Sequence, residues 1–207
     1  YNRRFYRDVL TSNSGMALLR ETVNRAVRLQ KPNVIALQQQ VYRSHFKDFV
    51  HPSASDVKAY LGEDFDRFWK FCFVRNPYDR LVSDYKWRLR KRGFDCPTIS
   101  FNEYLMRLDD PGRPDPEMLR PKTPNNREIY MIGDNVVADF IGRFENLMND
   151  MKHVCDHVGV PFDAAQFPHH KNGNNDPAAY RDYYGPEEKQ RVEKMFGHEL
   201  DLFEYRF

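Results

Sequence analysis

An arginine and a serine, Arg75 and Ser83, have the residue types and the setting that suit the binding of a phosphate group. Residues 68–74 are aromatic and β-branched and predict a buried strand. Pro77 suits the first turn of a helix, which places Ser83 two turns into that helix. Arginine supplies a planar fork of donors and serine a hydroxyl, a pairing that suits a phosphomonoester. The alternative is structural, an ion pair between Arg75 and Asp79 at the start of the helix, and the residues alone leave both open.

A second turn of small residues comes early in the chain. Residues 5–11 predict a strand before it, and the apolar spacing up to Pro32 predicts a helix after it. Turns of this kind bind anions in parallel sheets, because the first backbone amides of the helix face the ligand. A purely structural turn is the alternative, since the G-x-x-x-x-G-K-[ST] pattern of a nucleotide triphosphate site is missing. The candidate ligands of the turn are Ser12, Asn13, Ser14, Gly15, Met16 and Ala17.

The elements that position these turns alternate between strands and helices. Strands are predicted at 5–11, 33–37, 68–74 and 136–141, and helices at 53–61, 77–89, 101–108, 145–158 and 186–203. The alternation predicts parallel pairing and an α/β three-layer sandwich with a central parallel sheet, in a single domain over residues 1–207. Residues 96–126 are rich in proline and polar side chains, and we expect them to cross the substrate face as a long loop.

Composition narrows the class of protein. The chain of 207 residues is 41% hydrophobic and has 16 Phe and 12 Tyr, enough for one substantial core, which excludes a disordered or collagen-like chain. A net charge of +2 disfavours a nucleic-acid partner. No apolar stretch approaches the ~18 residues of a membrane span, and no His or Asp spacing indicates a metal site. The positive charge is clustered in one run, which contains Lys86, Arg88, Arg90, Lys91 and Arg92. Such a run lies either on a solvated helix face or at a site that binds anions.

Cysteine usage bears on the compartment. The 3 cysteines are an odd number without C-x-x-C spacing, and no N-x-[ST] sequon is present. These features favour a reducing, cytoplasmic location. A catalytic domain excised from a protein of the Golgi lumen is the alternative.

Several segments resemble motifs of one enzyme family, and they follow one another along the chain in the family's order. Residues 71–85 (FCFVRNPYDRLVSDY) resemble the 3′-phosphate-binding motif of the sulfotransferase family 2 group, which includes Golgi carbohydrate sulfotransferases and bacterial relatives. Residues 51–62 resemble the group's His-containing segment, and residues 139–147 its later strand-to-helix signature. Residues 170–173 with Tyr180, Tyr183 and Tyr184, and then residues 202–207, resemble its closing pattern. The resemblance covers roughly residues 45–207.

The resemblance implies a fold like that of P-loop nucleotide kinases and a nucleotide sulfate donor, PAPS (3′-phosphoadenosine 5′-phosphosulfate), with PAP as the product and no metal. Arg75 and Ser83 would then grip the 3′-phosphate, and the turn at residues 12–17 would hold the 5′-phosphosulfate. The family usually has a lysine in that turn, and this chain has none there. Lys171 is a candidate substitute. With Asn172 it lies in a Gly- and Asn-rich stretch that is either a cover over the nucleotide or a solvated loop.

The reaction that the resemblance implies is in-line transfer of a sulfuryl group from PAPS to an acceptor hydroxyl. A neutral histidine suits the role of base at pH 7. His51 is the first candidate for this base and His45 the second. The implied acceptor is a glycan or another small molecule with a hydroxyl group, and Arg127, Lys86 and Arg90 are candidates for holding an anionic one. At the end of the later strand, Arg143 and Glu145 are predicted to form a structural ion pair.

Three other functions remain as alternatives. A PAPS- or PAP-binding protein with weak or no turnover is suggested by the missing lysine. A nucleotide kinase-like phosphoryl transferase would use the same sheet, but the chain lacks the Walker lysine motif. A nucleic-acid-binding module would rest on the basic run alone.

Overall fold

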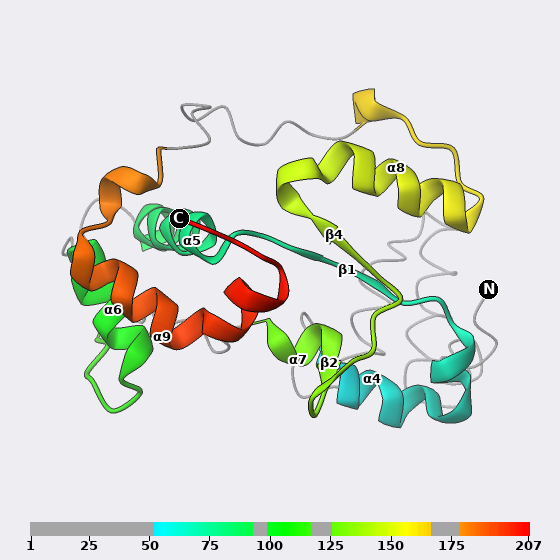
Figure 1. Ribbon diagram of the computed structural model, residues 1–207, viewed down its shortest axis with the longest axis horizontal. Helices are drawn as coiled ribbons and strands as arrows, with labels where there is room; N and C mark the ends of the chain where they lie inside the picture. The colour runs from blue at the N-terminus through cyan, green and yellow to red at the C-terminus, as the bar shows by residue number, and fades with distance from the viewer. Residues whose placement is uncertain (1–51, 93–98, 117–125, 167–178) are drawn as a thin grey trace, which may run out of the picture. The chain divides into compact units, whose positions relative to one another are not determined.

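The computed structural model describes residues 52–92, 99–116, 126–166 and 179–207 (Figure 1). The chain divides into two compact units, one of residues 1–68 with 131–135 and the other of residues 69–130 with 136–207. The strands predicted at 5–11 and 33–37, and the turn between them, lie outside the described residues. The single domain over residues 1–207 stays a prediction.

The first unit contains the predicted helix at residues 53–61. Helix α4 spans Ala54–Leu61, its cap residue Ser53 accepts a hydrogen bond from Asp56 N at 3.1 Å, and Gly62 ends it at a positive φ of 60°. A 3-10 helix that the sequence did not predict, η1, follows at Gly62–Arg67 and is closed by a bond from Phe68 N to Asp64 O. This turn delays the next strand, so β1 spans Phe71–Val74 instead of residues 68–74.

The predicted strand at residues 136–141 has the wrong bounds. Strands β2 (Met131–Ile132) and β3 (Asn135–Val136) form a short two-stranded sheet, with Gly133 in the turn at a φ of 60°. Val137 N then donates to Tyr130 O. The next strand, β4, therefore begins only at Phe140 and spans Phe140–Arg143.

The parallel pairing predicted from the sequence is confirmed in the second unit. Strand β1 pairs with β4 in a register that runs from Phe71 opposite Phe140 to Val74 opposite Arg143. Before the strands, Asp139 Oδ2 accepts from Lys70 N at 2.7 Å and contacts Lys70 Nζ at 2.8 Å, and these contacts lower the pKa of Asp139. The described residues hold two strands of this sheet, so the three-layer sandwich stays a prediction.

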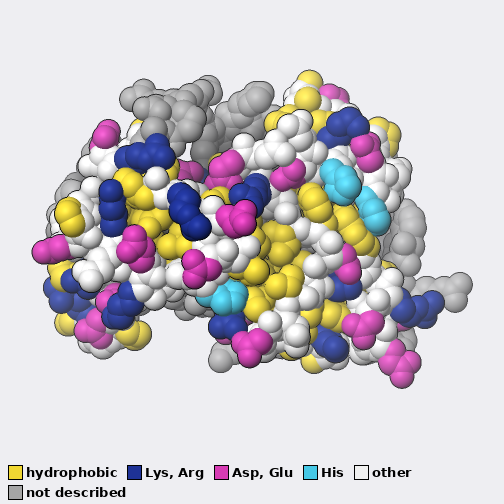
Figure 2. All heavy atoms as spheres, in the orientation of Figure 1, with side chains coloured by type: hydrophobic (Ala, Val, Ile, Leu, Met, Phe, Trp, Pro, Cys, Tyr) yellow, Lys and Arg dark blue, Asp and Glu magenta, His cyan; other side chains and the backbone are white. Residues whose placement is uncertain are grey.

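Helix α8 covers one face of the strand pair (Figure 1). After the 3-10 helix η2 (Phe144–Asn146), α8 spans Leu147–Val158 and ends, as predicted, at Gly159, whose φ of 71° is left-handed. The ring of His157 stacks on Trp69 with 3.8 Å between centroids, and the ring of His153 lies 4.7 Å from Phe140. Both histidines remain exposed to solvent, and Figure 2 shows two histidine side chains next to each other on the surface.

Three helices form the main apolar core of the second unit. They are α5 (Pro77–Arg92), α6 (Phe101–Asp109) and α9 (Pro186–Leu202), which agree closely with the predicted helices and pack against one another. Shorter elements are α7 (Arg127–Tyr130), η3 (Ala164–Gln166) and η4 (Arg181–Tyr183). Among the described helices, none is long and apolar enough to cross a membrane. The buried side chains of the three helices include Leu81, Val82, Tyr85, Tyr104, Leu105, Leu108, Val192, Phe196 and Leu200.

Polar groups of α6 bond within this core. The hydroxyl of Tyr104 donates to Asp84 Oδ2 at 2.6 Å and ties α6 to α5. Arg107 is buried and donates to Glu103 at 2.8 Å. Glu103 also accepts from Arg113 at 2.8 Å. The hydrogen bonds from Arg113 and Arg107 lower the pKa of Glu103 from 4.5 to about 2.

Candidate functional site

The predicted turn between a strand and a helix is formed at Arg75. This residue directly follows β1, and α5 begins at Pro77. Arg75 Nε donates to Asp79 Oδ2 at 2.6 Å, and the guanidinium carbon lies 4.4 Å from the centroid of the Phe144 ring. The structural alternative weighed from the sequence, an Arg75–Asp79 pair, is therefore present. The guanidinium is held by a carboxylate and by an aromatic face, in a side chain that is 17% exposed.

The ion pair with Asp79 engages two of the three guanidinium nitrogens of Arg75. Among the described residues no acceptor bonds Arg75 Nη1, because Asp79 is contacted through Nε and Nη2. Ser83 lies one helical turn beyond Asp79, on the same face of α5. Arg75 thus extends toward the helix face that carries Ser83, as a shared phosphate site requires.

A second carboxylate contacts the same turn. Glu145 follows β4, and its Oε1 accepts from Asn76 N at 2.7 Å. The predicted Arg143–Glu145 pair is wrong, because Arg143 Nη2 donates instead to Phe203 O at 2.9 Å. The chain enters η2 directly after Arg143, and Glu145 then meets the turn that follows β1.

Comparison with known proteins decides the family. The model of a family described as "Sulfotransferase family" matches residues 3–206, nearly the whole chain. The chain belongs to the sulfotransferase family. This sulfotransferase is also similar to an uncharacterized protein of Archaeoglobus fulgidus, at 31% identity over 104 residues, which make up 47% of this chain and 72% of that protein. No solved structure matches the present chain.

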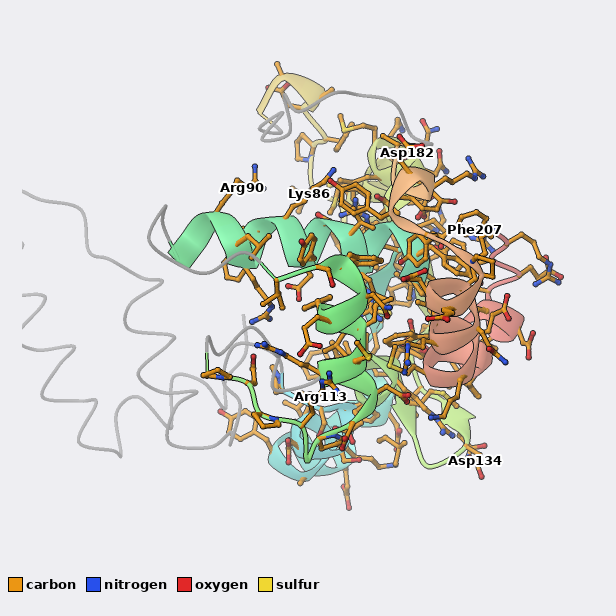
Figure 3. All side chains as sticks on the ribbon, turned by 90° about the vertical axis from the view of Figure 1, so that its left-hand side faces the viewer. Lys86, Arg90, Arg113, Asp134, Asp182 and Phe207 are labelled. Carbon is orange, nitrogen blue, oxygen red and sulfur yellow. The ribbon has the colours of Figure 1, made fainter. Side chains whose placement is uncertain are left out.

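Two of the predicted acceptor residues lie on α5 of this sulfotransferase. Lys86 and Arg90 are exposed and follow Ser83 at helical spacing on one face. Figure 3 shows both side chains projecting from the same side of the helix. Lys86 Nζ lies 4.6 Å above the ring of Tyr183. The structure therefore brings Ser83, Lys86 and Arg90 to one face of α5.

The remaining predicted residues are elsewhere or outside the described part. Arg127 begins α7, a separate element that packs against β1. Both candidate bases, His51 and His45, lie outside the described residues, as do the first turn at residues 12–17 and the pair Lys171 and Asn172.

The sequence did not predict the contacts that two residues make with the Arg75 turn. Phe144 supplies the ring under Arg75, and Glu145 bonds the amide of Asn76. These contacts follow from the strand register, in which Val74 lies opposite Arg143, and the sequence alone does not give that register. In parallel strands, the residues after these two must emerge side by side at one edge of the sheet.

Proposed function

We propose that this sulfotransferase transfers a sulfuryl group from PAPS to a hydroxyl of an acceptor, with a carbohydrate as the favoured acceptor class. The observation that carries the proposal is the turn after β1, where Arg75 bonds Asp79 and so extends along the α5 face that carries Ser83. A guanidinium and a hydroxyl so placed suit the 3′-phosphate of the donor. That phosphate separates PAPS from most other nucleotides of the cell.

The reaction follows from this placement of the donor. The acceptor oxygen forms a bond to sulfur while the bond between sulfur and the 5′-phosphate oxygen breaks, and PAP leaves. The proton of the acceptor hydroxyl passes to a histidine, for which His51 is the first candidate and His45 the second. Donors at residues 12–17, with Lys171 in place of the usual lysine, would stabilise the charge on the leaving oxygen. Lys86 and Arg90 would hold an anionic acceptor along α5, and Arg127 is a further candidate.

Thermal unfolding with PAP tests donor binding. At a PAP concentration 100 times Kd, binding adds about 2.7 kcal/mol to the free energy of unfolding. For a chain of this length, such a gain raises Tm by roughly 5–10 °C. We expect this shift in the wild type and its loss in Arg75→Ala, because the guanidinium that meets the phosphate is gone.

Arg88→Ala is a closely matched control. Arg88 bonds Asp84 through Nε at 2.6 Å and is 19% exposed, so it resembles Arg75 in its distance of four residues from a carboxylate partner, in bond length and in burial. Arg88→Ala should therefore lose a similar ion pair and keep the shift with PAP. A shift with ATP but none with PAP would contradict the proposal and favour the kinase-like alternative.

Transfer itself needs a separate assay. PAPS with a radiolabelled sulfate, incubated with a panel of neutral and acidic glycans, should yield a labelled glycan with the wild type and far less with Arg75→Ala. Binding of PAP without transfer to any acceptor would overturn the catalytic part of the proposal and favour a donor-binding protein.

A further inference from the structure

The carboxylate of Glu145 joins two segments that are far apart in the sequence. Its Oε1 accepts from Asn76 N at 2.7 Å, and its Oε2 accepts from the Tyr205 hydroxyl at 3.0 Å. Asn76 also donates from its side chain to Arg206 O at 3.2 Å. Residues 205–207, called the closing segment below, therefore hold the backbone of the turn that carries Arg75.

The third residue of the closing segment packs on the first turn of α5. Phe207 lies in edge-to-face contact with Tyr78, at 5.1 Å between ring centroids, and with Tyr184 at 5.5 Å. The Tyr184 hydroxyl donates to Tyr78 O at 2.9 Å. Lys189 Nζ lies 3.6 Å from the centroid of the Phe207 ring, a side chain labelled in Figure 3. Aromatic contacts of Phe207 thus add to the hydrogen bonds by which Asn76 accepts from Tyr78 N and Arg80 N at the start of α5.

Charge makes these contacts matter for a bound anion. A carboxylate near a phosphate site repels the phosphate more strongly the closer it lies, so donors that fix its position also fix this repulsion. Glu145 is held by the amide of Asn76 and by the hydroxyl of Tyr205. Burial, together with the nearby charge of Glu145, raises the pKa of Tyr205, so its hydroxyl stays a donor at neutral pH. Without that hydroxyl, one oxygen of Glu145 would lose its partner and the side chain would be free to shift.

We propose that Glu145 and the closing segment are positioning residues for Arg75, which fix its turn in the geometry that receives the 3′-phosphate of the donor. This inference rests on the proposed function. Binding and catalytic groups are sensitive to displacements of about 1 Å. Donor affinity should therefore depend on Tyr205 and Glu145, while the acceptor site should not.

Tyr205→Phe is the main test, because it removes a single hydroxyl from a ring that is 7% exposed. Tyr104→Phe is the matched control, since Tyr104 is 1% exposed and its hydroxyl donates to Asp84 Oδ2 at 2.6 Å, between α6 and α5. Calorimetry with PAP and initial rates with PAPS and the acceptor are measured for both variants. We expect Tyr205→Phe to weaken PAP binding and to raise the KM for PAPS about tenfold, with kcat and the acceptor KM unchanged. The control should keep the wild-type values.

A double-mutant comparison separates positioning from a general structural role. Arg75→Lys keeps a charge but removes the planar guanidinium that the turn orients. If Tyr205 acts through Arg75, Tyr205→Phe should change PAP affinity much less in the Arg75→Lys background than in the wild type. Glu145→Gln keeps one acceptor oxygen of the two, and we expect it to weaken PAP binding as well.

The outcomes distinguish this inference from the proposed function. Absence of PAP binding in the wild type would sink both. Normal PAP binding in Tyr205→Phe and Glu145→Gln, beside its loss in Arg75→Ala, would overturn the positioning role alone. Equal effects of Tyr205→Phe in the two Arg75 backgrounds, or equal changes in both KM values and kcat, would also overturn it.

Discussion

The contact between Gly142 and Phe73 gives a sharp test of the packing behind the site. The two residues lie opposite each other in the parallel register of β1 and β4. A Cβ atom added to Gly142 would meet the Phe73 ring at 2.5 Å from Cε1 and 2.7 Å from Cδ1. These distances are far shorter than any ordinary carbon contact, so Gly142→Ala must displace the ring or the strand.

The size of the effect follows from this overlap. Overpacking of a well-packed core by one carbon destabilises by about 1–3 kcal/mol. For a chain of this length, the loss lowers Tm by roughly 2–12 °C. Because β4 leads directly to Phe144 and Glu145, a displaced strand should also weaken the stabilisation by PAP. Differential scanning calorimetry with and without PAP measures both effects.

The same substitution elsewhere provides the control. A Cβ on Gly197, within α9, meets nothing within 4 Å. Gly197→Ala should therefore stabilise by about 0.5–1 kcal/mol, through the helix propensity of alanine. Phe73→Leu should recover part of the loss of Gly142→Ala, since the smaller side chain makes room. Wild-type stability in Gly142→Ala, or strictly additive effects with Phe73→Leu, would refute the steric argument.

Two further predictions concern the polar contacts of α6. Tyr104→Phe should lower the free energy of unfolding by about 1.5–3 kcal/mol in urea denaturation, because a buried hydroxyl bonded to Asp84 at 2.6 Å is lost; an unchanged urea midpoint would contradict this. The pKa of Glu103 is lowered from 4.5 to about 2, so its ion pairs stabilise fully above pH 4.5 and lose this contribution as the pH falls toward 2. Glu103→Gln should flatten the dependence of the urea midpoint on pH over that range, and profiles parallel to the wild type would count against the assignment.

The sequence predicted the helices well because their signals are local. Ser53 and Gly62 mark the two ends of α4, and Pro77 marks the start of α5. Gly159 ends α8 as expected. In each case one residue supplies the cap or the conformation that the boundary needs, so the surrounding structure adds little to the prediction.

Strand bounds and side-chain partners depended on distant residues. Residues 136–139 have the composition of a strand, yet Val137 bonds Tyr130 in the turn region before β4. Arg143 and Glu145 suggested a pair by charge and proximity, but Glu145 finds the amide of Asn76 instead. Local pattern cannot show such partners, because they are fixed by the parallel register of two strands that lie far apart in the sequence.

The strand pair is closed at both ends by a carboxylate of one strand and an amide of the other. Asp139 accepts from Lys70 N before the strands, Glu145 accepts from Asn76 N after them, and each bond joins residues 69 positions apart. Insertion or deletion of a single residue within either strand would preserve one of these bonds only by breaking the other. Relatives of this sulfotransferase should therefore vary in length within the connection between β1 and β4, and keep the two strands at a constant length.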